Sequence, residues 1–193
     1  MDLVIINYGA GNIQSIRFAF QRLGYDLELS ADPDRIRRAD KVIFPGVGEA
    51  SSAMAKLRQS GLDKMIPRLE QPVLGICLGM QLMCQRTAEG PTRGLGIFQT
   101  EVLRFEGGLK VPQIGWNSIR DLESPLFRGL DEEAFIYLVH SYYAPLCPDT
   151  IATSDYGLSY SAALARDNFF GVQFHPEKSG PTGARILQNF LKL

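Results

Sequence analysis

Apolar and polar positions alternate along the first half of the chain in a way that predicts both strands and helices. Short β-branched and aliphatic runs are typical of strands buried on both faces of a sheet; they lie at 2–7, 26–30, 41–45 and 72–76. Apolar residues three and four positions apart favour helices that pack on a sheet; such stretches lie at 15–23, 49–59 and 78–86. The alternation predicts a parallel sheet flanked by helices.

The pattern changes after Gly90. From 98 to 174 the apolar runs are shorter and strand-like, with turn sequences at 106–108, 155–157 and 167–168, before 181–193 ends as a helix. We therefore expect an α/β fold with a single open, mostly parallel sheet flanked by helices, and antiparallel strands added in the second half. No repeat or Pro/Ser-rich linker divides the chain, so the prediction is one domain over 1–193.

Composition and charge narrow the class of protein. Twenty basic and twenty-one acidic residues give a net charge of -1, which argues against a nucleic acid or an anionic membrane as the main partner. No apolar run approaches the ~20 residues that cross a bilayer, and the start at Met1 lacks the basic lead of a signal peptide. The three cysteines have no C-x-x-C spacing, so we expect free thiols and a cytoplasmic location.

A candidate nucleophile lies where the strand at 72–76 meets the following helix. Gly75-x-Cys77-x-Gly79 places a cysteine between two glycines, the pattern of a tight turn that lifts the central side chain above the sheet. Amides at the start of a helix favour the thiolate, which is the reactive form of cysteine.

The alternative interpretation is that Cys77 is a small buried hydrophobic residue, as isolated cysteines often are. For Cys84, two helical turns further on, the core interpretation is the stronger one. Cys147 lies in an apparent loop, and we assign it no role.

The search for a base is short because the chain has two histidines, His140 and His175. A buried strand at 170–174 ends in His175-Pro176-Glu177. In an extended chain, residues two apart point to the same side, so Glu177 is expected to orient the imidazole that faces Cys77. This is the arrangement of a nucleophile, base and carboxylate triad. His140 has no nearby carboxylate in sequence and is interpreted as structural or substrate-shaping.

Two other kinds of site are not supported by the residues. The histidines and cysteines are too few and too far apart for zinc. Gly9-x-Gly11 begins like a dinucleotide-binding turn, but Gln14 occupies the place of the third glycine. We expect no cofactor and no metal.

The motifs together resemble a known family. The stretch 75–81 (GICLGMQ) with His175-Pro176-Glu177 is similar to the triad, class I glutamine amidotransferases. Three further stretches, 7–12, 111–117 and 172–180, resemble the glutaminase subunits of imidazole glycerol phosphate synthase. The resemblance covers essentially the whole chain and implies a flavodoxin-like fold. Gln113, where the family often has histidine, and the polar residues at 49–51 depart from the pattern.

The resemblance implies roles for particular residues. Cys77 attacks the side-chain amide of glutamine, and His175 protonates the departing ammonia and later activates water. The amides of Leu78 and Val47 are the expected oxyanion donors. The expected substrate-binding residues are Gly46, Gln81, Glu89, Ser141 and Tyr142, with Glu89 on the α-ammonium group. Gln81 and Glu89 are alternatively solvated surface residues, and Tyr142 is alternatively a core residue.

The resemblance also implies a partner. Ammonia released into water is mostly protonated and diffuses away, so transfer needs a shielded route. The family supplies a (β/α)8-barrel cyclase subunit in a heterodimer, which makes imidazole glycerol phosphate and aminoimidazole carboxamide ribonucleotide. Asn12, Tyr137 and Lys178 are the residues expected to face it, and the isolated chain is expected to be a weak glutaminase.

Three other functions share part of this pattern. A glutaminase subunit that serves chorismate-derived, vitamin B6 or nucleotide-sugar synthesis would share the triad; the stretch 111–117 and Lys178-Ser179 argue against the first two. A stand-alone cysteine hydrolase or peptidase would need no partner, and Gln81 and Glu177 argue against it. A catalytically dead binding module would not need Cys77 and His175 intact.

Overall fold

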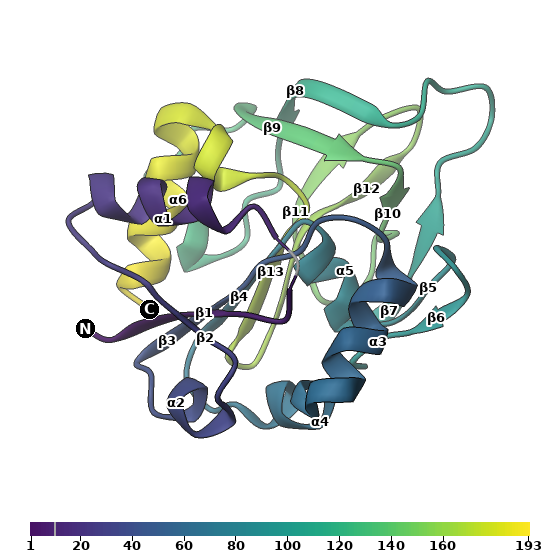
Figure 1. The fold of residues 1–193 in the computed structure, drawn as a ribbon. Coiled ribbons are helices and arrows are strands. Elements are labelled where there is room, and N and C mark those ends of the chain that lie inside the picture. The colour runs from purple at the N-terminus through teal and green to yellow at the C-terminus, as the bar shows by residue number, and fades with distance from the viewer. Residues whose placement is uncertain (10) are drawn as a thin grey trace.

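The computed structural model describes residues 1–9 and 11–193, so Ala10 of the 7–12 stretch lies outside the described residues. Its main sheet has the strand order β11-β12-β13-β4-β3-β1-β2 (Figure 1). The parallel strands are β1 (Leu3–Ile6), β2 (Glu28–Ser30), β3 (Lys41–Phe44), β4 (Val73–Ile76) and β13 (Phe169–Val172). Two antiparallel strands, β12 (Ser159–Arg166) and β11 (Thr150–Asp155), extend the sheet. The predicted mostly parallel sheet with added antiparallel strands is confirmed.

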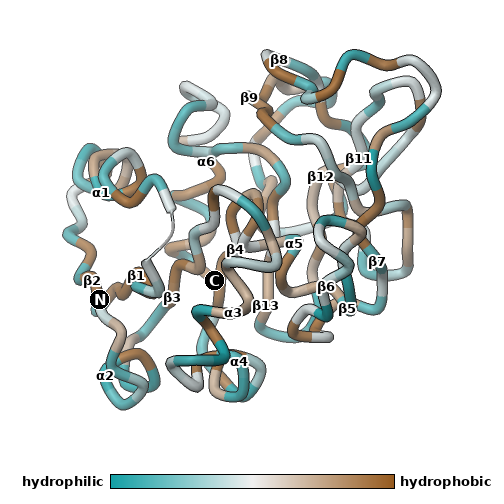
Figure 2. Tube along the Cα trace, turned by 45° about the vertical axis from the view of Figure 1, so that its right-hand side comes forward, coloured by the Kyte–Doolittle hydropathy of each residue, from teal (hydrophilic) through white to brown (hydrophobic). Residues whose placement is uncertain are grey.

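Alternate residues of the central strands point into two separate cores. Val4 and Ile6 pack on one face with residues of α3 (Ala50–Ser60) and α4 (Leu62–Met65). Leu3 and Ile5 pack on the other face with residues of α1 (Ile13–Arg22) and α6 (Gly180–Leu191). Burying each such aliphatic side chain stabilises the fold by about 1.5 to 3 kcal/mol. The helices therefore cover both faces (Figure 1), and the central strands are largely hydrophobic along their length (Figure 2).

Two smaller sheets lie beside the main one. The first has the order β10-β7-β5-β6 and the second is the hairpin-like pair β8-β9. Their bounds are β5 (Cys84–Thr87), β6 (Thr92–Arg93), β7 (Phe98–Arg104), β8 (Gln113–Ile119), β9 (Ala134–His140) and β10 (Tyr142–Tyr143). Short helical segments complete the chain: α2 (Pro33–Arg37), η1 (Ile66–Arg68), η2 (Pro125–Phe127) and η3 (Pro176–Lys178).

The helix expected over 78–86 was predicted too long. Helix α5 (Leu78–Met83) ends before Cys84, which begins β5. Although the helical spacing of apolar residues continues, the carbonyls of Leu82 and Met83 accept hydrogen bonds from Leu95 and Ile97. Hydrogen bonds from the segment between β6 and β7 have replaced those of a last helical turn. Cys84 is fully buried, which confirms its core interpretation, but it lies in a strand.

The fold brings residues distant in sequence to one edge of the main sheet. β4 and β13 are parallel neighbours, with Ile76 opposite Val172. Their carboxyl ends therefore lie side by side, and open α/β sheets place ligands at this edge. Cys77 follows β4 and the segment 173–177 follows β13, so the candidate nucleophile and base leave the sheet together. No helix among the described residues has the length and apolar character to cross a membrane.

Candidate active site

Cys77 lies on a strained turn between β4 and α5. Its backbone has φ 54° and ψ -111°, a conformation that residues with a side chain rarely adopt. Its N–H donates to the carbonyl of Val172 at 2.8 Å, which anchors the turn to the neighbouring strand. The predicted elbow geometry is therefore present.

Glycines surround this turn because backbone segments meet there without room for a side chain. A Cβ at Gly79 would overlap the carbonyl oxygen of Phe44, and one at Gly46 would overlap the amide of Gly79. A Cβ at Gly75 would lie 2.9 Å from the amide nitrogen of Met80. These contacts hold the loop after β3 directly against the start of α5.

His175 and Glu177 form a buried pair at the end of β13. His175 Nδ1 lies 2.9 Å from Glu177 Oε1, and the exposed fraction of the two side chains is 7% and 1%. The other oxygen, Oε2, is buried with no hydrogen-bond partner among the described residues. The predicted pairing of base and carboxylate is thus present.

The backbone that creates this pair differs from the expected extended one. Residues 176–178 form the 3-10 turn η3, closed by a hydrogen bond from the Lys178 N–H to the His175 carbonyl. Proline at the first position of a helical turn loses no hydrogen bond, so Pro176 is suited to begin this turn. The turn brings Glu177 back toward the imidazole.

The cysteine and the histidine open into one pocket of about 370 Å³. Eight of the predicted binding, oxyanion and interface residues also line it: Asn12, Val47, Leu78, Gln81, Glu89, Ser141, Tyr142 and Lys178. Gly46, Glu177 and Tyr137 do not line it. Gly46 lies beneath the pocket against α5, and Glu177 lies behind His175.

The surroundings of the two histidines shift their pKa values in opposite directions. Burial disfavours the charged form of His175, but hydrogen bonding to Cys77 and Glu177 and their charges outweigh burial and raise its pKa to about 10. Burial lowers the pKa of His140 to about 4, although the Tyr142 carbonyl, 2.7 Å from Nδ1, favours its proton. His175 is therefore the imidazolium and His140 the neutral imidazole at neutral pH.

The two imidazole signals of the protein should titrate far apart in a proton NMR pH series. We expect one transition near pH 4 and one near pH 10, with none at the ordinary histidine pKa of about 6.5. The folded-state pKa of His175 exceeds its unfolded value, so its proton stabilises the fold fully below pH 6.5. That stabilisation is lost as the pH rises through about 10. In a Cys77→Ala control only the alkaline transition should move, to lower pH; two transitions near 6.5 would refute this electrostatic picture.

The predicted substrate residues differ in what already contacts them. Gln81 is buried, and its Nε2 donates to the Tyr142 carbonyl and to Gln173 Oε1, both at 2.9 Å. Tyr142 is half-buried at the pocket wall, so it is not a plain core residue. Ser141 lies beside it on the same wall.

Glu89 is tied to the helix that follows the expected oxyanion loop. Its Oε2 accepts a hydrogen bond from the Ala50 N–H, the first residue of α3, at 2.9 Å. Burial raises the pKa of Glu89, and the charge of Glu49 raises it further, while the Ala50 hydrogen bond opposes the shift. A cation placed in the pocket would relieve this destabilised carboxylate, so Glu89 is not a simple solvated loop residue.

The loop 45–48 contributes Val47 and Gly48 to the lining of the pocket. Tyr8 donates from its hydroxyl to the Pro45 carbonyl at 2.8 Å, and burial and the charge of Cys77 raise the pKa of that hydroxyl. Val47 is 41% exposed and Gly48 has φ +94°, a conformation that favours glycine. Leu78, the first residue of α5, also lines the pocket and is the other expected oxyanion donor. Tyr8 was missed by sequence reasoning, because nothing local to the 7–12 stretch indicates its partner 37 residues away.

Gln173 is the other site residue that the sequence did not reveal. It is fully buried, and its Nε2 lies 3.8 Å from Cys77 Sγ. It occupies the first position after β13, beside Cys77 after β4. The parallel pairing of those strands is the signal that would have found it.

Two of the expected partner-facing residues, Asn12 and Lys178, line this pocket, and the third lies on a neighbouring apolar face. Tyr137 packs edge-on against Trp116, with ring centroids 5.8 Å apart. Trp116 is 57% exposed, and Ile114 and Phe135 of the same β8-β9 pair are 62% and 59% exposed. Val139, opposite Ile114 in the pair, lines the pocket. The exposed face of β8-β9 is therefore continuous with the pocket.

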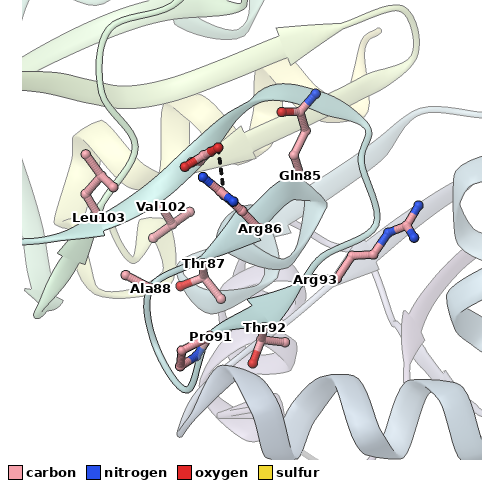
Figure 3. Close-up of a pocket in the computed structure, with 10 residues that line it drawn as sticks. Gln85, Arg86, Thr87, Ala88, Pro91, Thr92, Arg93, Val102 and Leu103 are labelled. Carbon is pink, nitrogen blue, oxygen red and sulfur yellow. Dashed lines mark ion pairs between the residues drawn. The ribbon is translucent and has the colours of Figure 1, made fainter.

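A larger cavity of about 660 Å³ lies elsewhere, along β5, β6 and β7 (Figure 3). Its lining includes the ion pair between Arg86 and Glu101, whose Nε and Oε1 are 2.7 Å apart, but neither cysteine nor histidine. Size alone therefore does not identify the reactive site. Within the described part of the chain no group of histidine, cysteine and carboxylate side chains is arranged to hold a metal.

Comparisons with known proteins show which family the chain resembles. The sequence profile described as glutamine amidotransferase class-I matches residues 4–193. A Bacteroides fragilis protein named imidazole glycerol phosphate synthase subunit HisH is 52% identical, with 100% of each chain covered. A Shewanella loihica protein of the same name is 47% identical over 100% of this chain and 91% of its own. A solved structure of a putative GMP synthase subunit from Thermoplasma acidophilum has a TM-score of 0.77 at 21% identity, covering 100% of this chain and 92% of that one. That last likeness shows the shared fold.

Proposed function

The chain belongs to the class-I glutamine amidotransferase family, and we propose that it serves as the glutamine-hydrolysing subunit of an imidazole glycerol phosphate synthase in histidine biosynthesis. The family profile spans 4–193, and relatives that carry this name are 45 to 52% identical over nearly the whole chain. The observation that carries the chemistry is the opening of Cys77 and the His175–Glu177 pair into one pocket. The domain is proposed to cover 1–193.

The first half-reaction forms a thioester. The Cys77 thiolate attacks the side-chain carboxamide carbon of glutamine, and the carbonyl π electrons move to oxygen. When the tetrahedral intermediate collapses, the C–N bond breaks and the His175 imidazolium gives its proton to the leaving nitrogen. Ammonia departs and a γ-glutamyl thioester remains on Cys77. The raised pKa of His175 supports this assignment, because the acid is protonated before substrate arrives.

The second half-reaction restores the thiolate and the imidazolium. Neutral His175 takes a proton from water, and the hydroxide that forms attacks the thioester carbon. The C–S bond then breaks, which releases glutamate and returns the electron pair to sulfur. Glu177 holds the imidazole in one tautomer through Nδ1 and stabilises its charge in both halves, which the 2.9 Å contact supports.

Stabilisation of the oxyanion is assigned to two backbone amides. Leu78 begins α5 next to the nucleophile, so its N–H is free of helical hydrogen bonds. Val47 supplies the second from the loop packed against α5 through Gly46. Removing one such donor typically costs about 10² to 10³ in rate, so a Val47 peptide turned away from the oxyanion would slow hydrolysis by about that factor.

Substrate selection is assigned to four other residues that line the pocket. Glu89 pairs with the α-ammonium group of glutamine, which offsets the cost of burying its carboxylate. Gln81 contributes its side-chain oxygen, and Ser141 and Tyr142 lie on the wall that receives the α-carboxylate. Gly46 contributes indirectly by letting the loop approach α5.

The partner is proposed to be a (β/α)8-barrel cyclase subunit that forms a heterodimer over the pocket mouth. The exposed apolar side chains of β8-β9 provide a surface that association would bury, with Tyr137 beside them and Asn12 and Lys178 at the pocket rim. Such a cover also keeps ammonia from water until it reaches the acceptor. The free cysteines suit a cytoplasmic location.

Adding a purified cyclase together with its nucleotide substrate should raise the rate of glutamine turnover by about 10²- to 10³-fold. This is the typical rate effect of one correctly placed oxyanion donor. Glutamate release and imidazole glycerol phosphate formation are measured together, and their rates should become equal. Ile114→Ser should weaken this stimulation. Leu146→Ser, a similar change at another exposed apolar position, should retain it. Full activity of the isolated chain, or stimulation only by an unrelated acceptor enzyme, would exclude the proposed function.

A further inference from the structure

Gln173 lies between the nucleophile and the substrate wall, and the steps above do not use it. Its side chain is fully buried, and its Nε2 lies 3.8 Å from Cys77 Sγ. Its Oε1 accepts from Gln81 Nε2 at 2.9 Å. Cys77 and Gln81 lie one helical turn apart, joined by the Gln81 N–H to the Cys77 carbonyl. Gln173 therefore bridges the residue that precedes α5 and a residue of its first turn.

A backbone carbonyl fixes the direction of every hydrogen bond in this chain of amides. The Tyr142 carbonyl can only accept, so Gln81 must present its NH₂ group to it. The second hydrogen of that NH₂ goes to Gln173, which must then present oxygen. Gln173 is left with its own NH₂ group toward the sulfur. The orientation of both amides is thus decided by the network of hydrogen bonds.

This orientation has a consequence at the sulfur atom. The Val139 carbonyl lies 3.9 Å from Sγ and can accept from the neutral thiol. The Gln173 N–H is a donor, and a donor is bound more strongly by a thiolate than by a thiol. The surroundings are buried, which strengthens the difference. Gln173 therefore opposes the Val139 carbonyl and favours the reactive form of the nucleophile.

The same orientation has a consequence at the pocket. Both hydrogens of the Gln81 amide are used by protein acceptors, so its Oε1 is the atom left for a ligand. Gln81 is one of the residues that line the pocket. A ligand group that meets this oxygen must be a hydrogen-bond donor, and ammonium and carboxamide groups are such donors.

We propose that Gln173 is a positioning residue that holds a hydrogen-bond donor against the Cys77 thiolate and locks Gln81 with its oxygen toward the substrate. The second half of this statement rests on the proposed function for the identity of the substrate. The first half does not, because it concerns the reactivity of Cys77 toward any electrophile.

The test is the rate of Cys77 alkylation by iodoacetamide as a function of pH, without glutamine. Gln173→Glu keeps the shape and still accepts from Gln81, but it presents a carboxylate oxygen to the sulfur. Losing a hydrogen bond to a charged group costs about tenfold or more, so alkylation at neutral pH should slow by at least about tenfold, with the pH profile moved to higher pH. Gln173→Met, which offers neither donor nor charge, should lie between this variant and the wild type.

The matched control is Gln99→Glu, the same chemical change at an exposed position on β7. It should leave the alkylation profile at the wild-type position. A wild-type profile in Gln173→Glu would overturn the proposal. So would an equal loss in Gln173→Glu and Gln173→Met at every pH, because that result indicates general loosening of the site. A protein that shows the expected profiles yet fails to hydrolyse glutamine would refute the proposed function and leave the role of Gln173 at the thiolate standing.

A second measurement needs no Gln173 variant and applies if those proteins fail to fold. In protein labelled with ¹⁵N at glutamine side chains, the Gln173 NH₂ signal should shift across the same pH range in which alkylation accelerates. Cys77→Ala should remove that shift. A Gln173 signal that is independent of pH in the wild type would contradict the hydrogen bond to sulfur.

Discussion

Replacing Cys77 with alanine should abolish glutamine hydrolysis, with a loss in kcat on the order of 10⁴-fold or more, because no other nucleophile replaces the sulfur. Cys84 is buried in the core and Cys147 does not line the pocket. Glutamate release is measured with the partner present, and circular dichroism establishes that the variant is folded. Cys84→Ser would be a poor control because the site is fully buried; Cys147→Ala, at a half-buried loop position, should retain full activity.

Substitutions of Cys77 should also show that the backbone conformation of this residue lowers the free energy of unfolding. Cys77 has φ 54° and ψ -111°, and residues with a Cβ in sparsely populated regions carry about 1 to 3 kcal/mol of strain. Glycine avoids that strain. Cys77→Gly should therefore unfold in urea at a higher concentration than Cys77→Ala, although both are inactive. Equal midpoints for the two variants would show that the turn is not strained.

The second large effect concerns the base. His175→Ala should slow acylation of Cys77 by a glutamine-analogue electrophile by about 10³- to 10⁴-fold, because it removes both the charge beside the thiolate and the proton donor. His140→Ala should only weaken acylation, since His140 is a neutral imidazole that hydrogen-bonds the Tyr142 carbonyl. Loss of labelling is followed by mass spectrometry of the intact chain. The assignment of the base would be wrong if the two variants exchanged these results.

The sequence predicted the parts of the site that depend on local pattern. Gly75-x-Cys77-x-Gly79 places a nucleophile at a strand end whatever the rest of the fold does, because the steric demand of the turn is local. His175 and Glu177 are likewise two residues apart, so their pairing requires only a short segment, and it is present although the segment is a 3-10 turn. The alternation of strands and helices similarly identified the parallel core.

What the sequence could not predict depends on contacts between distant segments. The end of α5 at Met83 is set by hydrogen bonds from Leu95 and Ile97, and no local signal marks it. From the sequence alone Gln173 is indistinguishable from its neighbours in a buried strand. Only the pairing of β13 with β4 shows that it lies beside Cys77. Glu89 resembled a loop residue, and only the folded chain places it on the Ala50 amide. Each of these is a tertiary effect that overrides or supplements the local pattern.

The insertion of β13 between β4 and β12 determines the stage of polypeptide synthesis at which glutamine hydrolysis becomes possible. The segment after β4 carries the sulfur, but the strand that brings the imidazole and its carboxylate is made more than ninety residues later. A nascent chain that has not yet reached residue 169 therefore holds a nucleophile without an acid or base and exposes the flank of β4. Such a chain lacks the residues that glutamine hydrolysis needs. Because β13 is the last strand to be synthesised, hydrolysis can begin only after β13 and α6 have packed onto the sheet.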